Sequence, residues 1–295
     1  MNKYIKLVSE IERGVLKSLA RALTIVENEL SGSDELLRDL DANTAAQVIG
    51  ITGPPGAGKS TLINAMIERL SLAEKRVAII AVDPTSPFNL GSILGDRIRM
   101  SAHFNKSNVF IRSVAARGSV GGLSAKIIEM TDVIRAARFD YIIVETVGVG
   151  QSELEIAGLA DLTVVVLVPE AGDEIQHIKS GLMEIGDVFV INKADREGAD
   201  VFAYRLNKML RQRKVSVFKT VADKGVGVDE LLASIMSSPK EENRRRVFLY
   251  AEKAYMLIQN NRMKNIDKTT VMEELEKVYL DEDFNLYTFI RRYID

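Results

Sequence analysis

The 295-residue chain contains no cysteine and only two histidines, His103 and His177. The absence of cysteine excludes disulfide bonds, thiolate metal ligands and cysteine nucleophiles. The two histidines are far apart in the sequence, so we expect each to have a structural role. A metal site built from cysteine and histidine ligands is therefore not expected.

The chain also lacks a surplus of charge of one sign, since Lys and Arg total 39 and Asp and Glu total 41. Binding to a nucleic-acid backbone usually requires a basic surplus on one face. The densest basic cluster is Arg244–Arg246, and Glu241 and Glu242 lie directly beside it. We interpret this cluster as a solvated linker or helix face and expect no nucleic-acid partner.

Long apolar runs are absent as well. The first residues begin an amphipathic pattern and contain no uninterrupted apolar stretch of signal-peptide length. No segment approaches the length of a membrane span. We therefore expect a soluble cytoplasmic protein that has no membrane partner.

The apolar pattern divides the chain into three parts. Residues 1–45 are expected to form a helical extension, because apolar side chains recur every three or four positions over Ile5–Val26 and a second short helix follows. Residues 46–238 alternate short apolar runs with helical patterns. Residues 239–295 are helical in pattern, and their apolar stripes must pack on the core or on another subunit.

Seven apolar runs in the middle part predict β-strands. Most are apolar at nearly every position, as expected for strands that are buried on both faces. Strands that alternate with helices form a mostly parallel sheet wrapped by helices, which is the α/β class. The predicted strands are Val48–Thr52, Val77–Val82, Val109–Val114, Tyr141–Val144, Leu162–Val168, Val188–Ile191 and Val215–Val221.

A phosphate-binding loop is predicted after the first strand, where Gly53–Thr61 matches the pattern G-x-x-x-x-G-K-[ST]. Its glycines allow backbone N–H groups to curl around an anionic phosphate, and the N-terminal end of the next helix points at the same place. We expect Lys59 to act as a catalytic residue at the β- and γ-phosphates, and Ser60 to bind Mg²⁺. The nucleotide-binding residues expected here are Gly53, Pro54, Gly56, Ala57, Gly58, Lys59, Ser60 and Thr61.

A guanine-binding tetrad follows the sixth predicted strand, where Asn192-Lys193-Ala194-Asp195 matches N-K-x-D. The carboxylate of Asp195 can accept hydrogen bonds from the N1–H and N2–H₂ groups of guanine. Adenine has an acceptor at N1 and no amino group at C2, so it would leave this carboxylate unpaired. The pattern therefore predicts that Asn192, Lys193 and Asp195 bind guanine, and that the chain is a GTPase rather than an ATPase.

A further loop of GTPases, often Ser-Ala, donates a backbone N–H to the O6 atom of guanine. Its expected place is after the seventh predicted strand, where the sequence is Val221-Ala222-Asp223-Lys224 and lacks the serine. We expect a backbone contact from Ala222 or Asp223 to serve instead.

Carboxylates near the ends of two strands are candidates for Mg²⁺ ligands. Asp83 ends the second predicted strand, Glu145 ends the fourth, and Asp96 lies in the segment between the second and third. Carboxylates beside a phosphate loop are placed to hold Mg²⁺ directly or through water. Gly148 resembles the switch glycine whose N–H senses a γ-phosphate. A capping role is the alternative for Asp83 and Asp96.

Taken together, these segments resemble the MeaB/ArgK family, the GTPase chaperones of adenosylcobalamin-dependent acyl-CoA mutases. The run Glu145–Glu153, E-T-V-G-V-G-Q-S-E, is highly specific to this group, and the resemblance extends over nearly the whole chain. The other segments that carry the resemblance are Gly53–Thr61, Asp83–Pro87, Gly91–Met100, Arg117–Leu123, Pro169–Lys179 and Asn192–Asp195.

The resemblance implies a P-loop NTPase fold and a homodimer to which the C-terminal helical arm contributes. It also implies binding to methylmalonyl-CoA mutase or a close relative, with GTP binding and hydrolysis that gate adenosylcobalamin delivery and rescue of inactivated mutase. The positions that match Mg²⁺ and phosphate ligands in the family are Lys59, Asp83, Asp96 and Glu145.

A further switch is implied by the resemblance at Asp173–Lys179, within which Gln176 and Lys179 are the switch candidates. The sequence departs from the family pattern at Glu170, where a glycine is expected after Pro169, and at the missing serine before Ala222. Phosphoryl transfer to water depends mainly on positioning and charge neutralisation, and Gln151 either orients the water or has a structural switch role. We expect slow intrinsic hydrolysis that the partner mutase accelerates.

Three alternative functions remain open from the sequence. A nickel metallochaperone GTPase shares this branch of P-loop proteins but relies on His and Cys ligands. A transport-linked kinase needs a site for a phosphate acceptor, and nothing in the sequence identifies one. A nucleotide-dependent scaffold without useful turnover is the third.

Overall fold

The computed structural model describes residues 3–42, 45–83, 100–115, 126–146, 152–169, 181–213, 215–238, 243–280 and 284–294. The chain forms two compact units, Met1–Arg246 and Val247–Asp295. The expected division of the chain into 1–45, 46–238 and 239–295 remains a prediction.

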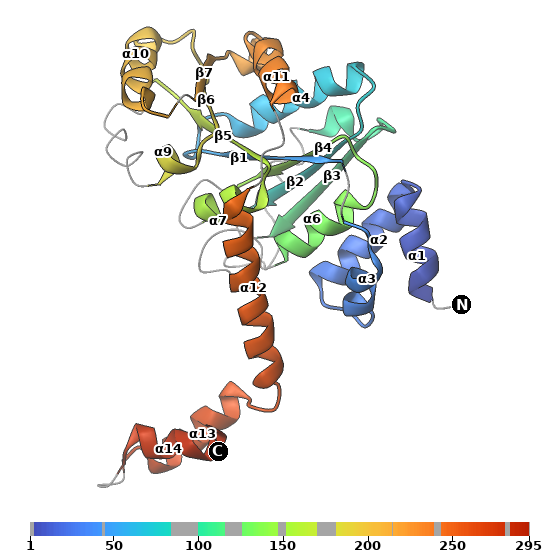
Figure 1. Ribbon diagram of the computed structural model, residues 1–295, viewed down its shortest axis with the longest axis vertical. Coiled ribbons are helices and arrows are strands. Elements are labelled where there is room, and N and C mark those ends of the chain that lie inside the picture. The colour runs from blue at the N-terminus through green and yellow to red at the C-terminus, as the bar shows by residue number, and fades with distance from the viewer. Residues whose placement is uncertain are drawn as a thin grey trace. The chain divides into compact units, whose positions relative to one another are not determined.

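The first unit is built on a seven-stranded sheet with the order β3-β2-β4-β1-β5-β6-β7 (Figure 1). Every pairing between neighbouring strands of this sheet is parallel. This arrangement confirms the predicted α/β fold and all seven strands, with shifts of one or two residues at some ends. The strands are β1 Gln47–Thr52, β2 Val77–Asp83, β3 Val109–Ala115, β4 Tyr141–Glu145, β5 Leu162–Leu167, β6 Val188–Ile191 and β7 Ser216–Lys219.

Burial of the strands follows their place in the sheet. Strands β1, β5 and β6 are buried at every position, whereas the edge strand β7 is exposed or half-buried along its length. Central strands of a parallel sheet are covered on both faces, which explains their continuous apolar runs. The phosphate loop therefore follows a strand at the centre of the sheet, where open α/β folds bind ligands.

Helices cover both faces of the sheet because side chains alternate along each strand. On one face, Val164 and Val166 of β5 join a core with α4 (Lys59–Leu72) and α11 (Val228–Ser237). On the other face, Val165 and Leu167 of β5 join a core with three helices. These are α7 Ser152–Leu159, α9 Leu182–Ile185 and α10 Ala199–Leu210.

Three short helices form the N-terminal part: α1 Lys3–Glu12, α2 Leu16–Glu27 and α3 Ser33–Asp39. The apolar spacing predicted an unbroken helical pattern to Val26, and this was wrong at Gly14, where a φ of 79° ends the first helix. Helix α2 packs against α6 (Ile127–Arg135), as Figure 1 shows. We call the first unit the body. Two ion pairs link the N-terminal helices to the rest of the body, Glu27 with Arg112 and Glu29 with Lys126.

The second unit contains most of α12 (Arg244–Arg262), together with α13 (Lys268–Val278) and α14 (Leu286–Ile294). Helices α12 and α13 bury no residue, whereas Phe289 of α14 is 4% exposed. The hydroxyl of Tyr293 donates to Glu274 at 2.6 Å and joins α14 to α13. Two single-turn helices complete the described structure, η1 Ser101–His103 and η2 Ala222–Lys224. Within the described ranges, no helix is both long enough and apolar enough to cross a bilayer.

Candidate nucleotide-binding site

The loop between β1 and α4 has a backbone that requires glycine. Gly53 has a φ of 138°, and a Cβ atom at this position would lie 2.1 Å from the carbonyl oxygen of Val166 on β5. Gly58 has a φ of 86° at the start of α4, and a Cβ atom there would lie 2.4 Å from Nδ2 of Asn192. The two glycines therefore allow the loop to pack tightly against β5 and against the predicted guanine tetrad.

Lys59 lies buried at the start of α4, with its side chain curled over the loop. Its Nζ atom donates to the carbonyl oxygens of Gly53 at 2.9 Å and Pro54 at 3.1 Å. These contacts hold the ammonium group at the loop itself. A phosphate bound by the loop would therefore meet a positive charge that is already in place.

Ser60 and Glu145 are brought together from positions 85 residues apart. The hydroxyl of Ser60 donates to Oε1 of Glu145 at 2.8 Å, and both side chains are buried. The contact exists because β4, which ends at Glu145, pairs with β1, which leads into the phosphate loop. Two predicted Mg²⁺ ligands thus lie at one point beside the loop.

These oxygen donors fit Mg²⁺, which prefers hydroxyl, carboxylate and phosphate oxygens and retains several waters. In the described part of the chain, no group of three or more His, Asp or Glu side chains could hold a metal by itself. Ser60 and Glu145 are the two predicted Mg²⁺ ligands that the described residues bring together.

Several predicted site residues lie outside the described structure. Asp83 ends β2, but its side chain is not described. The predicted residues beyond the described ranges are Asp96, Gly148, Gln151, Gln176 and Lys179. Their assigned roles stay predictions.

Two residues of the predicted guanine tetrad donate hydrogen bonds to the phosphate loop. Nδ2 of Asn192, which is 2% exposed, donates to the carbonyl oxygen of Ala57 at 3.0 Å. Nζ of Lys193 donates to the carbonyl oxygen of Gly56 at 2.8 Å. Two residues of the tetrad therefore hold the loop that the sequence assigns to the phosphates, and the two motifs form one site.

Asp195 remains accessible, with its side chain 44% exposed, and Nζ of Lys224 lies 2.8 Å from its Oδ2 atom. The hydrogen bond from Lys224 is the largest cause that lowers the pKa of Asp195 below its usual value. A lowered pKa keeps this carboxylate ionised, which is the form that the predicted guanine contacts require. Lys224 was not predicted as a site residue, although it lies in the loop after the seventh predicted strand.

The turn Val221–Val226 contains the residues predicted to contact guanine O6, and we call it the guanine loop; it lies against the tetrad through Asn192. Oδ1 of Asn192 accepts from the hydroxyl of Thr220 at 3.1 Å and from the backbone N–H of Ala222 at 3.2 Å. Ala222 thus lies at the predicted place, but its N–H already has an acceptor. The backbone N–H of Asp223 is the other donor that the sequence offered for guanine O6.

The arginine cluster before the arm has a role that sequence analysis missed. Arg245 is exposed on α12, as expected for a solvated helix face, whereas Arg246 is half-buried. Nη2 of Arg245 donates to the carbonyl oxygen of Glu184 at 2.8 Å, at the end of α9. Nη2 of Arg246 donates to Leu159 at the end of α7 at 3.2 Å and to Asp161 at 2.6 Å. Helix C-termini leave carbonyl groups unsatisfied and attract cations, which explains both contacts.

Asn243 completes this anchoring. Its Nδ2 atom donates to the carbonyl oxygens of Ala157 at 2.8 Å and Ala160 at 2.7 Å. The local sequence carried no sign of these contacts, because the acceptors are backbone groups more than 80 residues away. We call Asn243, Arg245 and Arg246 the arm root.

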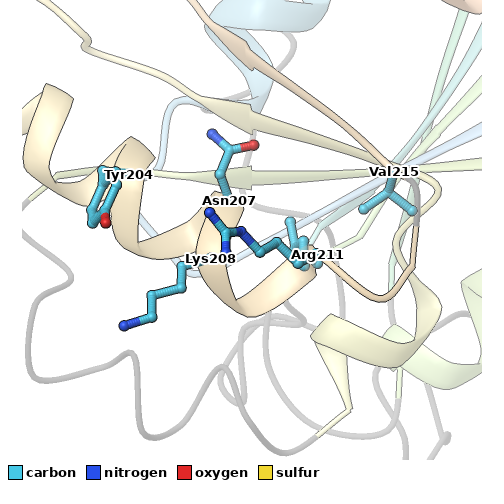
Figure 2. A pocket seen from close by; sticks show the side chains of 6 residues that line it. Tyr204, Asn207, Lys208, Arg211 and Val215 are labelled. Carbon is cyan, nitrogen blue, oxygen red and sulfur yellow. The ribbon is translucent and has the colours of Figure 1, made fainter.

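Two pockets bear on where the nucleotide binds. The one in Figure 2, of about 340 Å³, is lined by Tyr204, Asn207, Lys208, Leu210, Arg211 and Val215. It lies between the end of α10 and the start of β7, at the edge opposite the carboxyl ends of the strands, and is therefore not the nucleotide site. The other, of about 510 Å³, includes Arg69, Ala222 and Lys224 and borders the guanine loop.

Comparison with known proteins gives one family. The sequence profile described as "Methylmalonyl Co-A mutase-associated GTPase MeaB" matches residues 19–277. This range includes the phosphate loop, the tetrad, the arm root and most of the C-terminal helices.

Curated relatives and a solved structure agree with this match. A Pyrococcus horikoshii protein named as a candidate GTPase is 39% identical over 96% of this chain and 95% of its own. The Escherichia coli protein named GTPase ArgK is 34% identical over 95% of this chain and 87% of its own. The mouse protein named methylmalonic aciduria type A homolog, mitochondrial, is 32% identical over 83% of this chain and 68% of its own. A solved structure of a LAO/AO transport system kinase superposes with a TM-score of 0.69 at 25% identity, over 99% of this chain and 97% of that one.

Proposed function

The chain belongs to the MeaB family of methylmalonyl-CoA mutase-associated GTPases, and from this premise we propose that it is the GTP-dependent chaperone of an adenosylcobalamin-dependent acyl-CoA mutase. The family and the fold establish a GTPase. The proposal adds the partner and the purpose: GTP binding and hydrolysis gate delivery of the cofactor to the mutase and reactivation of inactivated mutase.

The observation that carries the proposal is the extent of the family match. It runs through residues 19–277 and so includes the arm as well as the two nucleotide motifs. A nucleotide site alone would fit many GTPases, since one fold hosts many functions. The mouse relative supports the same reading through its name, which refers to methylmalonic aciduria.

The proposed hydrolysis relies on charge neutralisation and on orientation of the attacking water. Lys59, held at the loop by two carbonyl oxygens, neutralises charge on the β- and γ-phosphates. Ser60 and Glu145 would hold Mg²⁺, which neutralises phosphate charge when bound. Gln151 is proposed to orient the attacking water, and Gly148 to sense the γ-phosphate.

Guanine selectivity is proposed to come from Asp195 and the loop at Ala222. The Asp195 carboxylate accepts from N1–H and N2–H₂, while the backbone N–H of Asp223 donates to O6, because that of Ala222 is bonded to Asn192. Asn192 supports both parts, because it bonds the phosphate loop through Nδ2 and the guanine loop through Oδ1.

A homodimer is proposed through the C-terminal helices. Large apolar side chains of the second unit stay exposed, which single folded chains rarely tolerate in such density. The exposed fractions are 69% for Val247, 71% for Phe248, 69% for Tyr255, 58% for Ile258 and 89% for Leu280. A second copy of the chain is the proposed cover for part of this surface.

The proposal is tested by nucleotide turnover with Mg²⁺, with and without an adenosylcobalamin-dependent mutase. GTP turnover that rises when the mutase is added, together with GTP-dependent transfer of cofactor to the mutase, is the expected result. Turnover that every such mutase leaves unchanged would remove the chaperone role and leave the GTPase. A preference for ATP would contradict the Asp195 assignment.

A further inference from the structure

Helix α4 reaches both ends of the proposed nucleotide site. It begins at Lys59 beside the phosphate loop and ends at Leu72, and it packs against α11 and η2 (Figure 1). The phosphate end of the site is assigned to its first turn. Its last turns carry Arg69, which had no part in the sequence analysis.

Arg69 contacts the guanine loop with one donor and the helix that follows it, α11, with another. Its Nη2 atom donates to the carbonyl oxygen of Gly225 at 3.0 Å, and its Nε atom donates to Oδ1 of Asp229 at 2.9 Å. Gly225 closes the turn that begins at Val221, and Asp229 lies in the first turn of α11. A planar guanidinium can make both bonds at once, which a point-like ammonium cannot.

The approach of Arg69 to the loop is close. Gly225 has a φ of 69°, and a Cβ atom at this position would lie 2.2 Å from Nη2 of Arg69. The turn is also closed on itself, since Val221 and Val226 exchange backbone bonds of 3.0 and 3.2 Å. The loop is therefore a short, closed turn whose outer side rests on α4.

Among the described residues, three polar side-chain contacts attach this turn to its surroundings. Asn192 accepts from the Ala222 N–H and Asp195 accepts from Lys224, so two of them lead to the tetrad. The third, through Arg69, leads to the helix of the phosphate loop, against which η2 also packs. Val221 occupies the position where a serine was expected and contributes no polar side chain. The turn thus depends on contacts made by other residues.

We propose that Arg69 is a positioning residue for guanine recognition, which fixes the distance between the guanine loop and the phosphate loop. It acts through the Gly225 carbonyl on the turn that carries the backbone N–H of Asp223, the donor proposed for guanine O6. This inference deepens the proposed guanine site and does not depend on the mutase partner.

The test is the affinity of Arg69→Ala for three diphosphates, measured by calorimetry. GDP offers all three recognition groups, 6-thio-GDP has a weakened acceptor at position 6, and IDP lacks the N2 amino group. We expect the Kd for GDP to rise by about tenfold, since one positioned hydrogen bond is worth about this factor. The preference for GDP over 6-thio-GDP should shrink, while the preference over IDP should persist because Asp195 is untouched.

Kinetics provide a second readout. The KM for GTP should rise with the Kd, while kcat at saturating GTP should stay within about twofold, because uniform binding is lost and not the chemistry. Arg69→Lys should recover only part of the affinity. Asp229→Asn keeps the contact between Arg69 and Gly225 and should retain most of the nucleotide affinity.

The matched control is Asp200→Ala, which removes an exposed 2.7 Å ion pair to Lys219 without touching the guanine loop. It should leave all three affinities unchanged. The inference would be overturned if Arg69→Ala lost thermal stability alone, or weakened GDP, 6-thio-GDP and IDP equally. A wild-type protein that bound IDP as tightly as GDP would instead contradict the Asp195 assignment.

Discussion

The two units of this chain bury their apolar side chains in opposite ways. In the body, β1, β5 and β6 are buried at every position and two cores cover the two faces of the sheet. In the second unit, α12 and α13 bury no residue. The body therefore buries its own hydrophobic pattern, whereas α12 and α13 leave theirs largely exposed.

The arm root marks the point in the chain where contacts with the body end. Asn243, Arg245 and Arg246 are fixed by carbonyl groups of the body, but Val247, the next residue, is 69% exposed. The start of α12 thus belongs to the body by polar capping, and its continuation does not. This contrast can be tested by matched substitutions on each side.

The largest effect on stability is expected from a pair of phenylalanines. Phe189 on β6 is fully buried, and Phe248 on α12 is 71% exposed. Phe189→Ala should lower the free energy of unfolding by about 3–5 kcal/mol, because it removes buried surface and leaves a cavity. Phe248→Ala should lower it by less than about 0.5 kcal/mol but weaken self-association. Urea denaturation measures the free energy of unfolding, and light scattering measures self-association. Equal losses of stability in the two variants would contradict the contrast between the two units.

We expect GTP hydrolysis to depend on the body and not on the second unit. Lys59→Ala should reduce GTP turnover by about 10²–10³-fold, the usual cost of removing a charge-stabilising group from a phosphoryl-transfer site. Its thermal unfolding should change little. Phe248→Ala, in the arm, should keep the intrinsic rate measured without mutase. If the arm variant lost as much activity as the Lys59 variant, the active site would not be confined to the body.

The arm root should show an intermediate effect. Arg246→Ala removes the 2.6 Å partner of Asp161, whose side chain is 10% exposed and keeps Arg135 at 3.5 Å. We expect a loss of about 2 kcal/mol in the free energy of unfolding of the body, since a buried carboxylate loses one of its two cations. Arg244→Ala, two residues earlier and exposed, is the matched control and should cost less than about 0.5 kcal/mol. Similar losses for both variants would restore the interpretation of a solvated cluster.

The smallest effect concerns pH and the body alone. Burial, followed by the nearby Lys106, lowers the pKa of His103, whose Nε2 atom lies 3.0 Å from Oδ1 of Asn64. Because the unfolded chain binds this proton more readily, stability should fall as the pH decreases from about 6.5 through the lower folded-state pKa. His103→Gln should flatten that part of the stability curve, followed by thermal unfolding between pH 5 and 8. An unchanged slope would show that His103 does not cause it.

Much of the fold followed from local pattern. The strands were predictable because each buried parallel strand, such as Val188–Ile191, is apolar at consecutive positions. The break at Gly14 was not predictable, because the apolar spacing continues across it and only the backbone conformation reveals the left-handed turn. The meeting of Ser60 and Glu145 followed from parallel pairing of their strands, which places strand ends at one edge.

Local sequence was enough to predict a phosphate loop, a guanine tetrad and an α/β sheet, because the residues that form each pattern are contiguous. The distant groups that support these elements could be identified only in the folded chain. Arg69 meets Gly225 across 156 positions, and Asn243 meets Ala157 across 86. In both cases the acceptor is a backbone carbonyl, which every residue carries, so no side-chain pattern could identify it in advance.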